Sequence, residues 1–264
     1  MTIAPVGSAA LLENNDGMFV PPEVVEILKG IKDPTFRETV RDYSAYPIFR
    51  RDVFIRGSMP IRNAAIEAQW LDRSFAIPSP RDDIPLEVRG IPRDVRLRAE
   101  VYDPILDELA RAPTTVRQLL THPTIKDFGM QRVVQALGTL TGMGHVDLCL
   151  DPADLAARTK RTNAFNRAVF ERASLSAETL FVASPVTGGG IHIMQVPMLI
   201  LLGLQKQPSA VPKFVNDALR AQNIRIRKDD KILETEEESQ AEIQSRIDQL
   251  QSKLIPLWRQ LKII

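Results

Sequence analysis

Few side chains in this 264-residue sequence are of the types that commonly perform catalysis, and they are widely spaced. None of the three histidines, His122, His145 and His192, belongs to a cluster with cysteines or carboxylates at metal-site spacing. The G-x-S-x-G, Walker A and H-E-x-x-H motifs are absent as well. The histidines are therefore interpreted as structural loop or strand residues. The sequence predicts no self-sufficient catalytic centre and no metal site.

The single cysteine, Cys149, lies in the apolar run VDLCL at 146–150. A cysteine in such a run most often behaves as a small core hydrophobe rather than as a nucleophile. No disulfide framework can form from one cysteine, which fits a reducing cytoplasm. We therefore expect Cys149 to be buried and the protein to be cytoplasmic.

A triple glycine, Gly188, Gly189 and Gly190, is the one feature that suggests a phosphate or dinucleotide site. A dinucleotide fingerprint needs G-x-G-x-x-G between a strand and a long helix, with an acidic residue about twenty positions further on. Here the glycines lead into IHIMQVP, which has the pattern of another extended segment. The preferred interpretation is a tight structural turn, with contact to a ligand or partner as the alternative.

Arginines are interspersed with aromatic residues between positions 49 and 56, in a segment that we call the arginine cluster. Arginine beside aromatic side chains is favoured in interfaces and in the recognition of carboxylate or phosphate. The alternative is a solvated face in which Asp52 pairs with the arginines. We predict that the cluster, together with the triple glycine, contacts another domain or a partner. Its members are Phe49, Arg50, Arg51, Asp52, Phe54 and Arg56.

Helices must position most of these residues. Three helices are predicted in the first third of the chain. Prolines and Gly30 delimit a short helix at 21–31, and a second, amphipathic helix runs from Asp33-Pro34 until Pro47. A third helix is predicted at 61–73, with Ala64, Ala65, Ala68 and Leu71 inward. The segment 48–60 is ambiguous between helix and strand.

The middle of the chain has the order of a winged-helix domain. A short strand at 75–78 and a hairpin of 85–88 with 95–98 precede a helix marked by Val101, Ile105 and Leu109. A short helix follows, with a capping box from Thr115 to Gln118. A longer helix at 130–144 then leads into a strand at 145–150, which completes the winged-helix order.

The last third returns to helices around the triple glycine. We predict an amphipathic helix at 164–173, an extended run at 179–197 folded over the glycines, and a buried helix at 198–206. Thr235 and Glu238 form a capping box for the final helix, which Pro256 should kink. Its apolar face repeats at three and four, through Ile243, Ile247, Leu250, Leu254, Leu257 and Leu261.

Charge and hydropathy narrow the classes of partner. The formal net charge of +1 gives no overall attraction to nucleic acid or anionic lipid. Between Met130 and Gly144, the helix that a winged-helix protein would insert into DNA, Arg132 is the one cationic residue, so nucleic acid is an improbable partner. The longest apolar stretch, VPMLILLGL at 196–204, is about half of what a bilayer-spanning helix needs. We expect no membrane partner.

Several segments together carry a resemblance to a known family. They are LLENND at 11–16, DPTFRETVRDYSAYPIFRRDVFIRG at 33–57, VYDPILDEL at 101–109, LTGMGHV at 140–146, FNRAVFERA at 165–173 and FVASPVTGGGI at 181–191. In these stretches the sequence resembles the methyltransferase regulatory region of class I methyltransferases that depend on S-adenosylmethionine, a group that includes bacterial protein-lysine methyltransferases.

The resemblance implies a division of labour between this chain and a catalytic domain. In that family a Rossmann-like domain binds S-adenosylmethionine and is followed by a helical regulatory domain and a winged-helix portion. This sequence is expected to begin after the catalytic domain, so no cofactor-binding or catalytic residue carries over and this chain binds no cofactor. The implied partner is a class I methyltransferase catalytic domain, in cis or in trans, and a protein substrate is compatible with the resemblance.

The expected fold class is α+β and predominantly helical, in three parts. Residues 1–82 form a helical regulatory region, residues 83–151 a winged-helix-like domain, and residues 152–264 a C-terminal helical region with a glycine-rich turn and a long terminal helix. The predicted function is the regulatory or substrate-recognition portion of a methyltransferase system, without catalysis by itself. The alternative is a stand-alone winged-helix interaction protein that binds protein rather than DNA.

Overall fold

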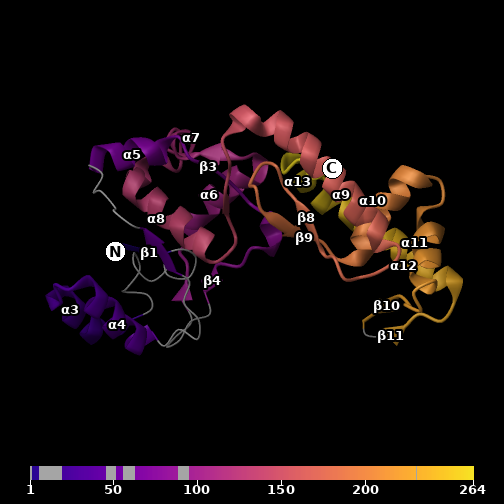
Figure 1. The fold of residues 1–264 in the computed structure, drawn as a ribbon, viewed down its shortest axis with the longest axis horizontal. Coiled ribbons are helices and arrows are strands. Elements are labelled where there is room, and N and C mark those ends of the chain that lie inside the picture. Colours follow the sequence, from indigo (N-terminus) through magenta and orange to yellow (C-terminus); the bar gives the residue numbers. More distant parts are fainter. Residues whose placement is uncertain (1, 6–19, 46–51, 56–62, 89–94, 230) are drawn as a thin grey trace. The chain divides into compact units, whose positions relative to one another are not determined.

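The computed structural model describes residues 2–5, 20–45, 52–55, 63–88, 95–229 and 231–264. Helices dominate this part of the chain, and the strands form small antiparallel sheets, which confirms the predicted α+β, mostly helical class (Figure 1). The chain divides into two compact units, Met1–Leu148 and Cys149–Ile264. The predicted domain limits at residues 82 and 151 stay predictions.

Unit 1 begins with a strand pair and two short helices. Strand β1 (Thr2–Pro5) pairs antiparallel with β2 (Asp52–Ile55), so the ambiguous segment contains a strand. Helix α3 (Pro22–Gly30) starts at prolines, as predicted, because a first-turn residue needs no N–H partner. Helix α4 (Pro34–Ala45) has a side-chain cap, since the backbone N–H of Phe36 donates to Asp33 Oδ1 at 2.6 Å.

Helix α5 (Asn63–Leu71) forms where it was predicted, but its predicted inward face is wrong. Ala64, Ala65 and Ala68 are exposed and Leu71 is half-buried. Alanine is compatible with both the surface and the core, so the pattern of small residues did not determine which face turns inward. The ring of Trp70 instead stacks on that of Phe75 in the next strand, with centroids 6.1 Å apart.

Strands from three parts of unit 1 form one small sheet. Strand β3 (Ser74–Ala76) lies between β6 (Thr114–Thr115) and β7 (Asp147–Leu148), antiparallel to both. A separate hairpin joins β4 (Glu87–Val88) to β5 (Val95–Arg96), as predicted. The short 3-10 helix η1 (Arg81–Asp83) is held to helix α6 (Ala99–Arg111) because the Arg81 guanidinium pairs with Asp103 and Asp107.

Three helices pack together beside this sheet. They are α6, α7 (Val116–Leu119) and α8 (Gly129–Gly142), with the 3-10 helix η2 (Lys126–Phe128) before α8. Helix α6 contacts β3, α7 contacts β6, and α8 contacts α6 and α7. The predicted apolar spacing is confirmed in α6 and α8, whose buried positions include Ile105, Leu109, Val133, Leu137 and Leu140. The predicted capping box of α7 is present, with Gln118 N–H donating to Thr115 Oγ1 at 3.2 Å.

Unit 2 is built around a long helix and a hairpin. The 3-10 helix η3 (Pro152–Asp154) leads into α9 (Leu155–Ala173), which begins earlier than predicted. Strands β8 (Phe181–Ala183) and β9 (Gly190–His192) pair antiparallel, with Gly188 and Gly189 in the turn between them and Gly190 as the first residue of β9. The predicted extended run over the triple glycine is therefore confirmed up to Met194, whereas residues 195–197 already belong to the next helix.

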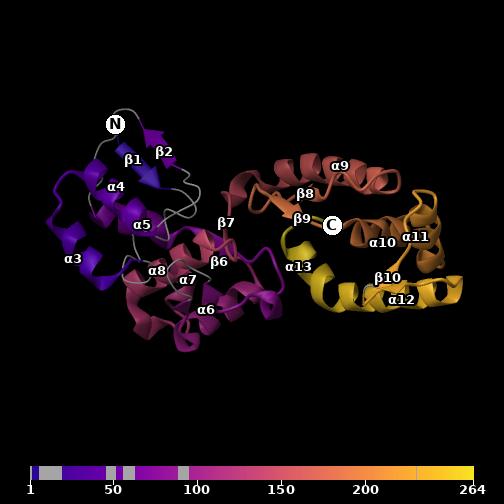
Figure 2. The same ribbon diagram turned by 90° about the horizontal axis from the view of Figure 1, so that it is seen from below.

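Helix α10 (Gln195–Lys206) is the central helix of unit 2. Every residue from Met198 to Gly203 is buried, as expected for a helix that is apolar on all sides. It packs on α9 and on α11 (Val211–Arg220), and α11 packs on α12 (Glu236–Gln249) (Figure 2). Neither α11 nor the following hairpin of β10 (Arg227–Lys228) and β11 (Lys231–Ile232) was predicted.

The terminal helix is interrupted close to the predicted kink. Helix α12 (Glu236–Gln249) carries the predicted capping box of Thr235 and Glu238. A π-helical turn, η4 (Leu250–Leu254), separates it from α13 (Ile255–Gln260), in whose first turn Pro256 lies. Because Pro256 has no N–H, it cannot donate to a carbonyl of the preceding turn, and the α-helical pattern gives way to the π-helical turn directly before it. The predicted apolar face is buried except at Leu254, which is half-buried.

Candidate functional site

The arginine cluster lies largely outside the described residues. Phe49, Arg50, Arg51 and Arg56 are not among them, and Asp52 and Phe54 are described only as backbone in β2, opposite Pro5 and Ile3. The predicted interface role of this cluster therefore stays a prediction.

The triple glycine forms a tight turn between β8 and β9. Gly188 has φ of 73°, and a Cβ at this position would lie 2.6 Å from Leu150 Cδ1. Its N–H donates to the Ser184 carbonyl at 2.8 Å, and the Gly189 N–H donates to Thr187 Oγ1 at 3.3 Å. These amides are therefore engaged within the turn itself, as a structural turn requires.

A buried polar network holds this turn against α9 and the C-terminal residues. Asn166 exchanges two hydrogen bonds with the backbone of Ala183, at 2.7 and 3.0 Å, and also donates to the Ile263 carbonyl at 3.2 Å. The Ser184 hydroxyl donates to the Leu261 carbonyl at 2.9 Å. Both side chains are buried with their hydrogen bonds made, so the network stabilises the turn and has no vacant donor for a ligand.

The histidines and the cysteine occupy separate places. His122 Nε2 lies 3.2 Å from Glu108 Oε1. The rings of His192 and Phe181 meet edge to face, with their centroids 5.3 Å apart. Burial lowers the pKa of His145. Cys149 is half-buried, so the prediction that it is a core residue is wrong, because the strand β7 ends just before it at the boundary of unit 1.

Among the described residues, no group of three or more histidine, cysteine, aspartate or glutamate side chains lies close enough together to hold a metal ion. Over the same residues, no helix combines the length and apolarity that crossing a bilayer would require.

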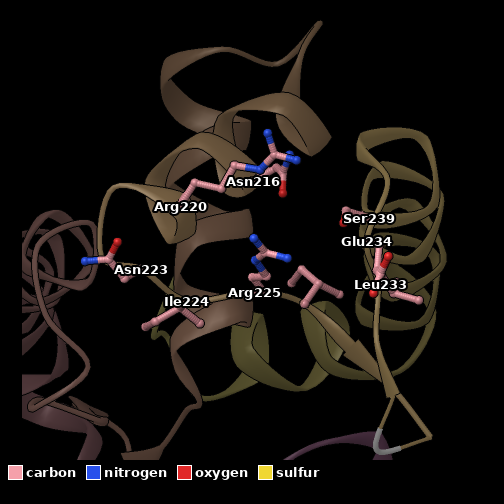
Figure 3. Close-up of a pocket in the computed structure, with 9 residues that line it drawn as sticks. Asn216, Arg220, Asn223, Ile224, Arg225, Leu233, Glu234 and Ser239 are labelled. Carbon is pink, nitrogen blue, oxygen red and sulfur yellow. The ribbon is translucent and has the colours of Figure 1, made fainter.

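A pocket of about 350 Å³ lies in unit 2, between the end of α11, the segment that follows it, and the start of α12 (Figure 3). We call it the α11–α12 pocket. Its polar lining comes from Asn216, Arg220, Asn223, Arg225, Glu234 and Ser239, and its apolar lining from Ile224, Ile226 and Leu233.

Asn216 is the most unusual residue of this pocket. Its side chain is 3% exposed, and its amide nitrogen Nδ2 has no hydrogen-bond partner in the described part of the chain. A buried amide without a partner is costly, and such groups are rare in folded proteins. The helix that carries Asn216 buries Val211, Val215 and Leu219 on the same side, so a polar residue interrupts an apolar stripe.

Two arginines and one glutamate line the pocket that contains the Asn216 amide. Arg220 and Arg225 extend towards the space beside Asn216, and Glu234 lies across from them on the chain leading into α12 (Figure 3). Arg220 has its nearest carboxylate, that of Glu236, at 3.7 Å, and Arg225 forms no ion pair with any described residue. The pocket therefore has a cationic wall and a single facing carboxylate.

Sequence reasoning predicted α12 but missed the pocket, because it missed α11 and the segment after it, which supply most of the lining. A usable signal was nevertheless present in VPKFVNDALR at 211–220, where Asn216 occupies an inward position of the helical period. Polar residues at such positions need a partner, which makes them candidates for a binding site.

Comparisons with known proteins give two similarities. Residues 3–56 match the family model described as "Predicted methyltransferase regulatory domain". The chain is also 31% identical over 258 residues to a Synechocystis sp. protein described as "Uncharacterized protein sll1526". That match covers 98% of this chain and 51% of the relative, so the chain spans about half the length of this relative. No solved structure matches the chain.

The family match covers part of the sequence in which this chain resembles methyltransferase regulatory regions. It falls on the N-terminal part of the segments that carried the resemblance, including the arginine cluster, and relates that part of the chain to methyltransferase regulation. The similarity to the Synechocystis relative extends through both units.

Proposed function

We propose that this chain is the regulatory or substrate-recognition portion of a class I methyltransferase system that depends on S-adenosylmethionine. The observation that carries the proposal is the similarity of residues 3–56 to the methyltransferase regulatory family. In this proposal the chain is not catalytic by itself and binds no S-adenosylmethionine. Its partner is a class I catalytic domain, in cis or in trans.

The test measures association and rate with the full chain. The chain is mixed with the class I methyltransferase catalytic domain encoded nearest to it, and complex formation is followed by size-exclusion chromatography. Methylation is followed by transfer of labelled methyl groups to protein. We expect a stable complex and a changed methylation rate, whereas the absence of both would contradict the proposal.

Variants of the arginine cluster test which surface makes this contact. Replacing Arg50, Arg51 and Arg56 by glutamine should weaken the complex, because arginines in interfaces form charge-assisted hydrogen bonds. The matched control replaces the exposed arginines Arg161, Arg167 and Arg172 of α9, with the same change of net charge. An equal loss in both variants would indicate a general effect of charge rather than a specific interface.

Calorimetry with S-adenosylmethionine tests the catalytic part of the proposal. We expect no heat of binding to the chain alone. Saturable binding would show that the chain carries its own cofactor site and would overturn the assignment of a regulatory role without catalysis.

The second candidate is a stand-alone winged-helix interaction protein. It is favoured by the order α6, β6, α7, α8 and β7, three helices with a small antiparallel sheet. Arg132 is the one cationic residue between Met130 and Gly144, so we propose protein rather than DNA as the ligand of this module. Salt-dependent binding to duplex DNA at low ionic strength would contradict that preference.

A further inference from the structure

The α11–α12 pocket brings together an unsatisfied buried donor and two guanidinium groups, of which that of Arg225 forms no ion pair with a described residue. Nδ2 of Asn216 needs an acceptor, and none of the described residues supplies one. Water alone can fill such a role, but two guanidinium groups beside the same space favour an acceptor with negative charge. An oxyanion is therefore the best match for the acceptor that Asn216 Nδ2 lacks.

The facing carboxylate restricts what else the ligand can carry. Glu234 lines the same pocket and forms no ion pair with a described residue, so it would repel a second negative group on its side. It would attract an ammonium or hydroxyl group. The pocket volume of about 350 Å³ is in the range of sites that hold small molecules.

We propose that the α11–α12 pocket binds a small dipolar molecule through its carboxylate or phosphate. Asn216, Arg220 and Arg225 hold the oxyanion, and Glu234 accepts a hydrogen bond from an amine or hydroxyl at the other end. This site lies outside residues 3–56, so the inference does not rest on the proposed regulatory function.

The test titrates the full chain with three probes, inorganic phosphate, glycine and succinate, while NMR follows the Asn216 side-chain amide and the Arg225 Nε–H. Saturable shifts with glycine but not phosphate identify a carboxylate ligand, and the reverse identifies a phosphate ligand. Succinate should bind less tightly than glycine, because its second carboxylate faces Glu234. The absence of saturable shifts with all three probes would overturn the proposal.

Two variants and a control separate binding from folding. Arg225→Gln should weaken binding by at least about tenfold, since it removes a charge-assisted hydrogen bond. Arg167→Gln, which changes an exposed arginine of α9 outside the pocket, should bind as the unsubstituted protein does. If Arg225→Gln binds equally well, the guanidinium does not hold the ligand and the proposal fails.

Asn216→Leu supplies the second readout. Leucine has the same branched side-chain shape without a polar atom, so the melting temperature of the free protein should stay the same or rise, while binding is lost. A protein in which Asn216 serves only to hold a water molecule would instead keep its affinity for the probe after this substitution, which would contradict the proposed role of the amide.

Discussion

Two features of the structure favour glycine at position 188: the backbone conformation and the close approach of a neighbouring side chain. Its φ of 73° lies in the left-handed region, and the side chain of Leu150 fills the space that a Cβ would need. The neighbouring Gly189 has neither constraint, because its Cβ would meet Thr187 Oγ1 at an ordinary 3.6 Å. The two glycines therefore differ in what they tolerate, although they look alike in the sequence.

Gly188→Ala should lower the free energy of unfolding by about 1–2 kcal/mol, mainly from strain in the left-handed backbone, because the exposed Leu150 side chain can turn away from the added Cβ. Denaturant unfolding measures the loss. Gly189→Ala is the matched control and should change it by less than about 0.5 kcal/mol. The losses from Gly188→Ala and Leu150→Ala should therefore be close to additive in the double variant, and a double variant much more stable than their sum would show that the contact with Leu150, rather than the backbone, is the main cost.

His145 and Asp147 should make stability depend on pH in opposite directions. Burial lowers the pKa of His145 from 6.5, so below pH 6.5 the unfolded chain takes up a proton before the folded chain does, and stability falls. Burial raises the pKa of Asp147 from 3.8, so the folded chain takes up that proton first, and stability is gained as pH falls towards 3.8.

Substitution of His145 isolates its part of this dependence. His145→Gln should flatten the fall in melting temperature that occurs as pH drops below 6.5, because glutamine does not titrate. Thermal melts of both proteins across this window give the comparison. The same substitution at the exposed His192 is the control and should leave the fall in place. An unchanged fall in His145→Gln would rule out His145 as its source.

At the scale of elements, local signals were reliable where they depended on adjacent residues. The capping boxes at Thr115 and Thr235 and the proline-initiated α3 formed as predicted, because caps satisfy backbone donors of the first helical turn. The face of α5 was not predictable, since alanine does not distinguish core from surface. Helix α11 was missed although it is strongly amphipathic.

Removing the side-chain cap of α12 should by itself lower the free energy of unfolding measurably. Thr235→Ala removes the acceptor for the Glu238 N–H and should cost about 1 kcal/mol of unfolding free energy. The control is Thr159→Ala, whose hydroxyl donates to the Leu155 carbonyl inside α9, a type of bond that adds little to a helix. Equal losses in the two variants would mean that the capping hydrogen bond is not what stabilises α12.

Ion pairs attach the β10–β11 hairpin to α12 and thereby support one wall of the pocket. Glu242 accepts from Arg246 Nε at 2.9 Å and lies 3.5 Å from Lys228 Nζ, and these cations lower the pKa of its carboxyl. Arg246 also donates to the Arg227 carbonyl at 2.6 Å. Residues far apart in the sequence therefore fix the segment that carries Glu234.

At the scale of the whole molecule, each of the two units has its own core. Helices α9, α10, α11 and α12 pack on one another within Cys149–Ile264, and the polar networks of Asn166 and Gln195 close within the same residues. A unit with a complete core is expected to fold alone.

Residues 149–264 expressed alone should therefore unfold in one cooperative thermal transition. Circular dichroism measures the transition, and the dispersion of amide signals in NMR reports packing. A fragment that starts at residue 175, which lacks α9, is the control and should lose cooperativity because α10 loses a packing partner. A 149–264 fragment without a cooperative transition would mean that unit 2 depends on unit 1.

The sequence by itself determined the class of the fold, most helix positions, both capping boxes, the turn at the triple glycine, and the resemblance to methyltransferase regulatory regions. Each of these depends on neighbouring residues or on a repeating pattern. Only the tertiary structure decided that Cys149 is half-buried, which face of α5 is exposed, and that Asn216, Arg220, Arg225 and Glu234 line one pocket. Those outcomes depend on how separate elements pack, since burial and pairing across the fold are properties of contacts between distant segments.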